Sequence, residues 1–207
     1  KGHFQVVKSI LDGSYNGGVY DKNNYKVKGA EFLDNKSDKK PKITKVIVFA
    51  GGGERNGITK EESKAIWEIY AKYIPELIVM DGGDNPMFAA KDYAKENSDI
   101  DLFAITGIRG EKDFIDLRRI TTFTNTPNVK GLAISNPGFM QRASDLRNLA
   151  LKGEYNKTRE YFPKEISNSE FDEIVVMLKD NIVAEVLSSN IEGFIDEYFQ
   201  TDESLWA

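Results

Sequence analysis

Four short apolar runs in this sequence each end in glycine together with charged or amide side chains. Glycine lets the backbone come close to a ligand, and arginine binds phosphate or carboxylate through two parallel hydrogen bonds. Carboxylates in the same loops are candidates for a general base or for ligands of a divalent cation. The candidate ligand-binding residues are Gly51, Gly52, Gly53, Glu54, Asp81, Gly82, Gly83, Asp84, Arg109, Glu111, Asn136 and Arg142.

The four runs are predicted to be parallel strands over residues 45–50, 76–81, 101–106 and 131–135. Each is short and wholly or mainly apolar, which is typical of strands that helices cover on both faces. Parallel strands bring their carboxyl ends to one edge of a sheet, and ligands of open α/β sheets bind at that edge. We therefore expect the four loops to line one concave surface that binds an anion.

Helical patterns separate the predicted strands. Thr59 and Glu62 form a capping box ahead of a stretch whose apolar residues share one stripe and which stops before Pro75. Pro86 suits the first turn of the next helix. A charged helix or turn is expected over residues 111–119. Repeated strand–helix alternation predicts a parallel sheet with right-handed crossovers.

The fold class predicted from this pattern is α/β, a Rossmann-like three-layer sandwich with a mainly parallel sheet and extra C-terminal helices. One domain is expected over residues 1–207, because the length suits a single sizeable core. Its strand–helix core is assigned to residues 43–152, which include a last helix from 139 to 151, and its helical tail to residues 153–207.

The two ends of the chain read differently from the core. In residues 1–42, apolar pieces such as 4–7 and 25–27 are separated by glycine and asparagine, so we expect a small hairpin or irregular layer followed by a loop. In the tail, two apolar stripes at helical spacing, over 171–178 and 182–198, predict two amphipathic helices. Both are expected to pack on the sheet.

Composition excludes several kinds of chemistry. The sequence has no cysteine, so thiol nucleophiles, disulfides and thiolate metal sites are excluded, and its one histidine, His3, is near the amino end, far from the predicted loops. A net charge of −5 argues against a nucleic-acid partner, which normally requires a basic face. No run approaches the ~20 apolar residues of a transmembrane helix.

Each candidate residue also has a purely structural interpretation. The three glycines at 51–53 lack the spacing of a dinucleotide-binding or P-loop motif and are equally suited to a turn. Asp81 and Asp84 either bind a divalent cation or cap the following helix. Arg109 and Arg142 either face a ligand or are surface charges. No metal or cofactor is assigned.

Four segments occur in the order of motifs found in the bacterial YdcF/SanA/ElyC-type domain, which this sequence resembles over residues 45–151. They are Val46–Gly53, Ala65–Tyr70, Ile78–Gly83 and Leu132–Ala143. The closest match is Phe139-Met140-Gln141-Arg142-Ala143, which is similar to the family's His-Met-x-Arg-Ala. The resemblance implies a Rossmann-like fold and an envelope-linked group with nucleotide or adenosylmethionine binding.

The sequence departs from that family's pattern in three respects. Its serine before the glycine pair is Asp81 here, and its histidine is Phe139. The family's acidic and Thr…Asn residues between the third and fourth strands have no clear counterpart around Glu111–Arg119. The residues that carry over are Gly51, Gly52, Gly53, Gly82, Gly83 and Arg142.

Three classes of function stay open at this stage. The first is an enzyme acting on a small anionic or sugar-nucleotide-like ligand, the second a non-catalytic ligand-binding or sensing domain, and the third a surface interaction module with a vestigial cleft. The fold by itself does not choose among them. The compartment is also open, since a cytoplasmic chain and an extracytoplasmic chain that has lost an N-terminal segment both fit this composition.

Overall fold

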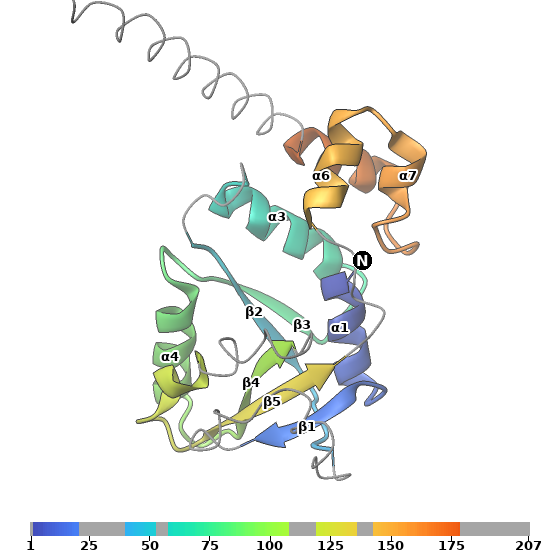
Figure 1. Ribbon diagram of the computed structural model, residues 1–207. Coiled ribbons are helices and arrows are strands. Elements are labelled where there is room, and N and C mark those ends of the chain that lie inside the picture. Colours follow the sequence, from blue (N-terminus) through green and yellow to red (C-terminus); the bar gives the residue numbers. More distant parts are fainter. Residues whose placement is uncertain (1, 21–39, 53–57, 108–118, 136–142, 179–207) are drawn as a thin grey trace, which may run out of the picture.

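The computed structural model describes residues 2–20, 40–52, 58–107, 119–135 and 143–178 (Figure 1). Its strands are β1 (Asn16–Tyr20), β2 (Val46–Ala50), β3 (Leu77–Asp81), β4 (Leu102–Gly107) and β5 (Val129–Ser135). Its helices are α1 (Gly2–Leu11), α3 (Lys60–Ala71), α4 (Pro86–Glu96), the 3-10 helix η3 (Arg119–Phe123), α6 (Ala143–Leu151) and α7 (Tyr155–Arg159). Residues 168–178 are also helical.

The four predicted strands are confirmed as β2 to β5, with ends shifted by at most two residues. β2 pairs with β3 in parallel, and β4 pairs with β5 in parallel. Within the described ranges the two pairs belong to separate sheets, one of order β2-β3 and one of order β1-β5-β4. The fold is therefore mixed α/β, whereas the single sheet of a Rossmann-like sandwich stays a prediction.

The hairpin or irregular layer predicted at the amino end is wrong for the described part of that segment. Residues 2–11 form α1 because Phe4, Val7 and Ile10 recur at helical spacing and are all buried. The glycines at 17 and 18 lie within β1, which adds an antiparallel strand to β5. The apolar piece at 25–27 lies outside the described residues.

The helix boundaries follow local signals in the sequence. Thr59 and Glu62 form the predicted capping box, with the Glu62 amide donating to Thr59 Oγ1 and the Thr59 amide donating to the Glu62 carboxylate. Pro86 is in the first turn of α4, as predicted. The predicted segments 111–118 and 139–142 lie outside the described residues, and α6 accounts for the rest of the last core helix.

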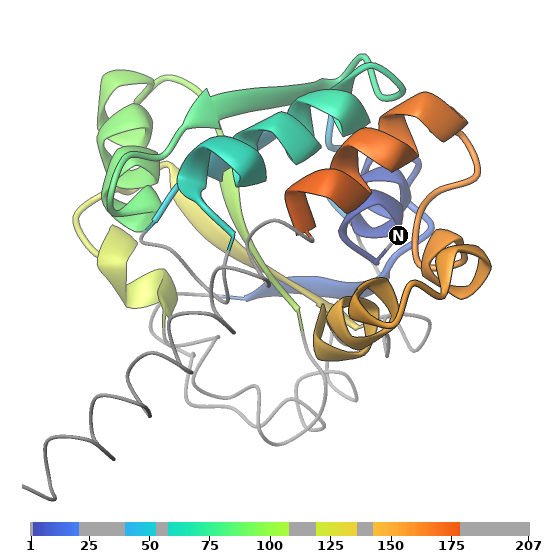
Figure 2. The ribbon, with the colours of Figure 1, turned by 90° about the horizontal axis from the view of Figure 1, so that it is seen from above.

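The main core joins α1, α3 and the helix over residues 168–178 to β2, β3 and β5. Figure 2 shows that helix, coloured dark orange, beside α3 and close to α1. Its predicted stripe is buried, and the Phe4 ring of α1 meets the Tyr70 ring of α3 edge-on at 5.3 Å between centroids. The buried residues of the stripe are Phe171, Ile174, Val175 and Leu178. The second predicted tail stripe lies outside the described residues.

A smaller core lies beneath α4. Ala94 packs there with side chains of η3, β5 and β1, including Tyr20. Tyr20 is paired in register with Gly131, and its ring fills the space where a Gly131 side chain would be. A Cβ added at Gly131 would lie 2.4 Å from Tyr20 Cζ. The absence of a side chain at Gly131 is therefore what allows β1 to close on β5.

Replacing Gly131 with alanine is expected to destabilise the protein by about 1–3 kcal/mol, because the buried Tyr20 ring must move. Chemical denaturation measures this loss. Gly107→Ala is the matched control, since a Cβ there meets nothing within 4 Å. Equal stability of the two variants would contradict the proposed role of the Tyr20 ring.

Candidate functional site

The loops that follow β2 and β3 touch each other through their backbones. The Gly82 amide donates to the Ala50 carbonyl at 2.6 Å, and the Gly52 amide donates to the Gly83 carbonyl at 2.8 Å. These two bonds continue the parallel pairing of β2 and β3 beyond the last strand residues. Two of the four predicted loops are thus neighbours, as parallel strands require.

Close approach explains why these loops are made of glycine. A Cβ added at Gly51 would lie 2.4 Å from the Gly83 carbonyl oxygen, and one at Gly82 would lie 3.0 Å from the Ala50 carbonyl oxygen. Gly52 and Gly83 have φ of 97° and 56°, which L side chains rarely adopt. Loop packing therefore accounts for these four glycines without a ligand, which for Gly51 and Gly52 agrees with their interpretation as turn residues.

Asp81 belongs to the turn itself. Its carboxylate oxygen Oδ1 accepts the Gly83 amide at 2.7 Å. That hydrogen bond lowers the pKa of Asp81, and the positive charges of Lys60 and Lys64 lower it further. Asp81 is exposed and ionised at neutral pH, so this edge has a fixed negative charge with two lysines of α3 nearby.

Asp84 is exposed beside this turn and does not cap α4. The cap is Asn85, whose side-chain oxygen accepts the Met87 amide at 3.2 Å. The prediction that the aspartate pair caps the helix is therefore wrong, because the next residue in the chain does so. Among the described residues, no group of three or more acidic or histidine side chains is arranged to hold a metal ion.

Six of the twelve predicted site residues can be placed. The described residues brought together at the edge of β2 and β3 are Gly51, Gly52, Asp81, Gly82, Gly83 and Asp84. The others lie outside the described ranges, namely Gly53, Glu54, Arg109, Glu111, Asn136 and Arg142. Lys60 and Lys64 were not predicted as site residues. The capping box at Thr59 is the signal for them, because it places both lysines in the first two turns of α3.

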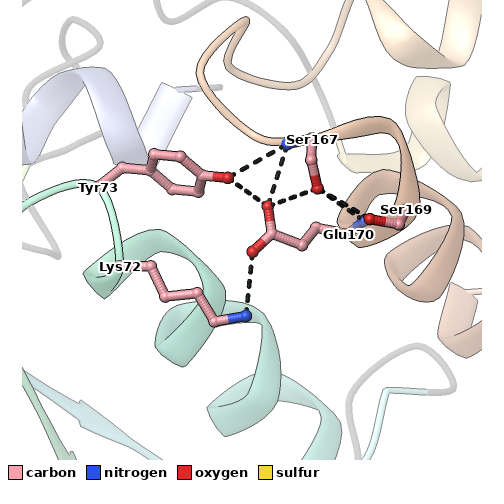
Figure 3. Close-up of polar contacts among 5 residues, drawn as sticks. All are labelled: Lys72, Tyr73, Ser167, Ser169 and Glu170. Carbon is pink, nitrogen blue, oxygen red and sulfur yellow. Dashed lines mark hydrogen bonds and ion pairs between the residues drawn. The ribbon is translucent and has the colours of Figure 1, made fainter.

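A second polar cluster, which sequence reasoning missed, gathers on Glu170 (Figure 3). Its carboxylate accepts hydrogen bonds from the Tyr73 hydroxyl, from Lys72 Nζ at 3.0 Å and from the Ser167 amide at 3.0 Å. The Glu170 amide donates to Ser167 Oγ at 3.2 Å, which completes a capping box. The Ser-x-x-Glu spacing before an apolar stripe is the signal that would have found this capping box, but not the contacts from Tyr73 and Lys72.

This cluster fixes where the helix over residues 168–178 begins against the end of α3. The hydrogen bond from Tyr73, the ion pair with Lys72 and the Ser167 amide lower the pKa of Glu170 to about 2. The four buried apolar side chains of the helix each contribute about 1.5–3 kcal/mol. Attachment of the helix therefore depends on apolar burial, whereas the cluster sets its register.

No helix in the described part of the chain is long and apolar enough to cross a membrane.

Replacing Gly51 with alanine is expected to separate the two loops, because the added Cβ overlaps the Gly83 carbonyl. We expect a loss of about 1–3 kcal/mol in unfolding free energy, as is usual for overpacking. Amide hydrogen exchange should also become faster at Gly52 and Gly82, whose amides bridge the loops. Unchanged exchange at both amides would contradict the loop contact.

Replacing Glu170 with glutamine is expected to lower the melting temperature at neutral pH. The pKa of Glu170 is lowered from 4.5 to about 2, so its stabilisation is complete above pH 4.5 and is lost as the pH falls toward 2. The difference in melting temperature between the parent and the Glu170→Gln variant should shrink as the pH falls from 4.5 toward 2. Glu96→Gln, an exposed carboxylate on α4 outside this cluster, is the control, and its melting temperature should stay close to that of the parent.

Comparison with protein-family models, with curated proteins and with solved structures finds no match for this chain.

Proposed function

We propose that this chain binds a small phosphorylated ligand, of the sugar-phosphate or nucleotide class, at the carboxyl edge of β2 and β3. One observation carries the proposal. Two glycine-rich loops meet there beside Asp81, and two lysines of α3 are close enough to that carboxylate to lower its pKa.

The charges at this edge favour a ligand that has both anionic and hydroxyl groups. Lys60 and Lys64 supply cations for a phosphate, since ammonium groups bind phosphate strongly. Asp81 and Asp84 are acceptors that suit the hydroxyls of a sugar. A bare phosphate would meet the repulsion of both carboxylates without the hydroxyl contacts, so a sugar phosphate should bind more tightly than phosphate does.

The amino termini of α3 and α4 contribute less to anion binding than their helix dipoles suggest. Thr59 and Glu62 cap α3, and Asn85 caps α4, so side chains already bond to amides in both first turns. Lysine side chains are therefore the principal anion ligands in this proposal. Binding needs no proton-transfer group, so the proposal is of a binding site and assigns no reaction.

The test is a thermal-shift and calorimetry series with inorganic phosphate, glucose 1-phosphate, a uridine diphosphate sugar and ATP. A ligand that binds the folded state raises its melting temperature by mass action. The Lys60→Ala, Lys64→Ala double variant should bind the best ligand at least tenfold more weakly, since a charged hydrogen bond contributes about 1.5–3 kcal/mol.

Lys157→Ala is the control, because this exposed lysine of α7 pairs with Glu154, and α7 does not contribute to the proposed site. It should bind as the parent does. Absence of a shift with every probe at millimolar concentration, or equal binding by the double variant, would refute the proposed site.

A further inference from the structure

The outer edge of β3 has no strand partner in the part of the chain that the structure describes. The Val46 amide donates to the Glu76 carbonyl and the Gly82 amide donates to the Ala50 carbonyl. Together with the parallel register, these bonds turn the backbone groups of Ile78 and Met80 toward β2. The amide and carbonyl of Val79 therefore point to the opposite, outer edge.

Figure 2 shows β3 along the rim of the molecule, beyond α3. A row of outward amides and carbonyls is a template for another strand. Ile78, the second residue of β3, is 38% exposed, although it lies in an apolar strand. A charged side chain at position 78 would protect the edge from pairing with other chains. The exposed isoleucine therefore favours an edge that binds a partner.

Acidic side chains lie at both ends of this edge. Glu76 precedes β3, Asp81 ends it and Asp84 follows, and all three are exposed. Lys60 and Lys64 lie near Asp81, so the Glu76 end has the clearer negative character. An apolar centre between acidic ends is complementary to a strand with basic ends.

We propose that the outer edge of β3 binds an extended basic segment of a partner protein by strand addition. Main-chain hydrogen bonds to Val79 hold the segment, Ile78 contacts its apolar centre, and lysine or arginine at its ends meets Glu76 and Asp84. This surface shares Asp84 with the proposed ligand site, but Glu76 and the outward main-chain groups of Val79 do not belong to that site.

Charge argues against a second copy of this chain as the occupant. Antiparallel self-pairing centred on Val79 would place Leu77 of one copy opposite Asp81 of the other. Glu76 and Asp81 of different copies would then gather at each end of the ribbon, and like charges across strands destabilise pairing. A basic segment replaces this repulsion with attraction.

The experiment uses the full chain and three synthetic peptides labelled with a fluorophore. The first is Lys-Lys-Val-Thr-Val-Thr-Lys-Lys, the second has glutamate in place of every lysine, and the third has proline in place of the second valine. Fluorescence anisotropy measures their binding. We expect the lysine peptide to bind at least tenfold more tightly than either of the others.

Two variants locate the binding. Val79→Pro removes one outward amide and leaves the bonds between β2 and β3 in place, and it should weaken the lysine peptide at least tenfold. Glu76→Lys should weaken the lysine peptide and strengthen the glutamate peptide. The melting temperature and circular dichroism of each variant are measured beside the parent, so that loss of binding is separated from loss of the fold.

Several outcomes would overturn the inference. They are failure of the lysine peptide to bind at millimolar concentration, equal binding of the proline peptide, and unchanged binding by both variants when folded. Dimerisation of the chain alone that Val79→Pro abolishes would identify a second copy as the occupant instead. If the parent chain binds the lysine peptide but none of the sugar phosphates, the proposed ligand site is refuted and the strand-addition proposal stands.

Discussion

Packing of three helices against β2, β3 and β5 fixes the positions of the two polar groups described above, the loops after β2 and β3 and the cluster at Glu170. α1, α3 and the helix over residues 168–178 come from three separate parts of the chain and bury their apolar stripes in one core. Because such interiors pack densely, a shift of one helix would displace the others. The loops after β2 and β3 and the cluster at Glu170 both depend on this arrangement, although they lie on different elements.

Within that arrangement, backbone contacts determine the chemistry of the edge. The loop glycines allow two chain segments to approach to hydrogen-bonding distance, and this places Asp81 where the Gly83 amide reaches it. The loop contact takes up the amides of Gly52 and Gly82, and the Asp81 carboxylate takes up the amide of Gly83. Charged side chains on the neighbouring helix, rather than these amides, therefore remain for an anion.

The outer side of β3 and its carboxyl end are proposed to bind different partners. Its carboxyl end leads into the turn that forms the proposed ligand site, and its outer side offers a main-chain surface. The first use depends on side-chain charge and the second on unpaired backbone groups. Pairing with β2 supports both, because it keeps β3 extended and fixes which backbone groups face outward.

The sequence by itself determined the four strands of the core, the capping box at Thr59, the proline start of α4 and the buried stripe over residues 171–178. These are local signals, since periodicity and capping involve residues within a few positions of one another. It also located the glycine loops after β2 and β3. It failed for α1, where a run of apolar residues reads equally as strand or helix until a partner surface exists.

Only the tertiary structure decided what depends on distant contacts. It showed that strand β1 joins β5 across more than a hundred residues, that Tyr20 fills the space above Gly131, and that Tyr73 and Lys72 reach Glu170. It also showed that the loop glycines serve a contact between two chain segments and that the charges of Lys60 and Lys64 lower the pKa of Asp81. Such pairings are set by three-dimensional packing, and no spacing along the chain records them.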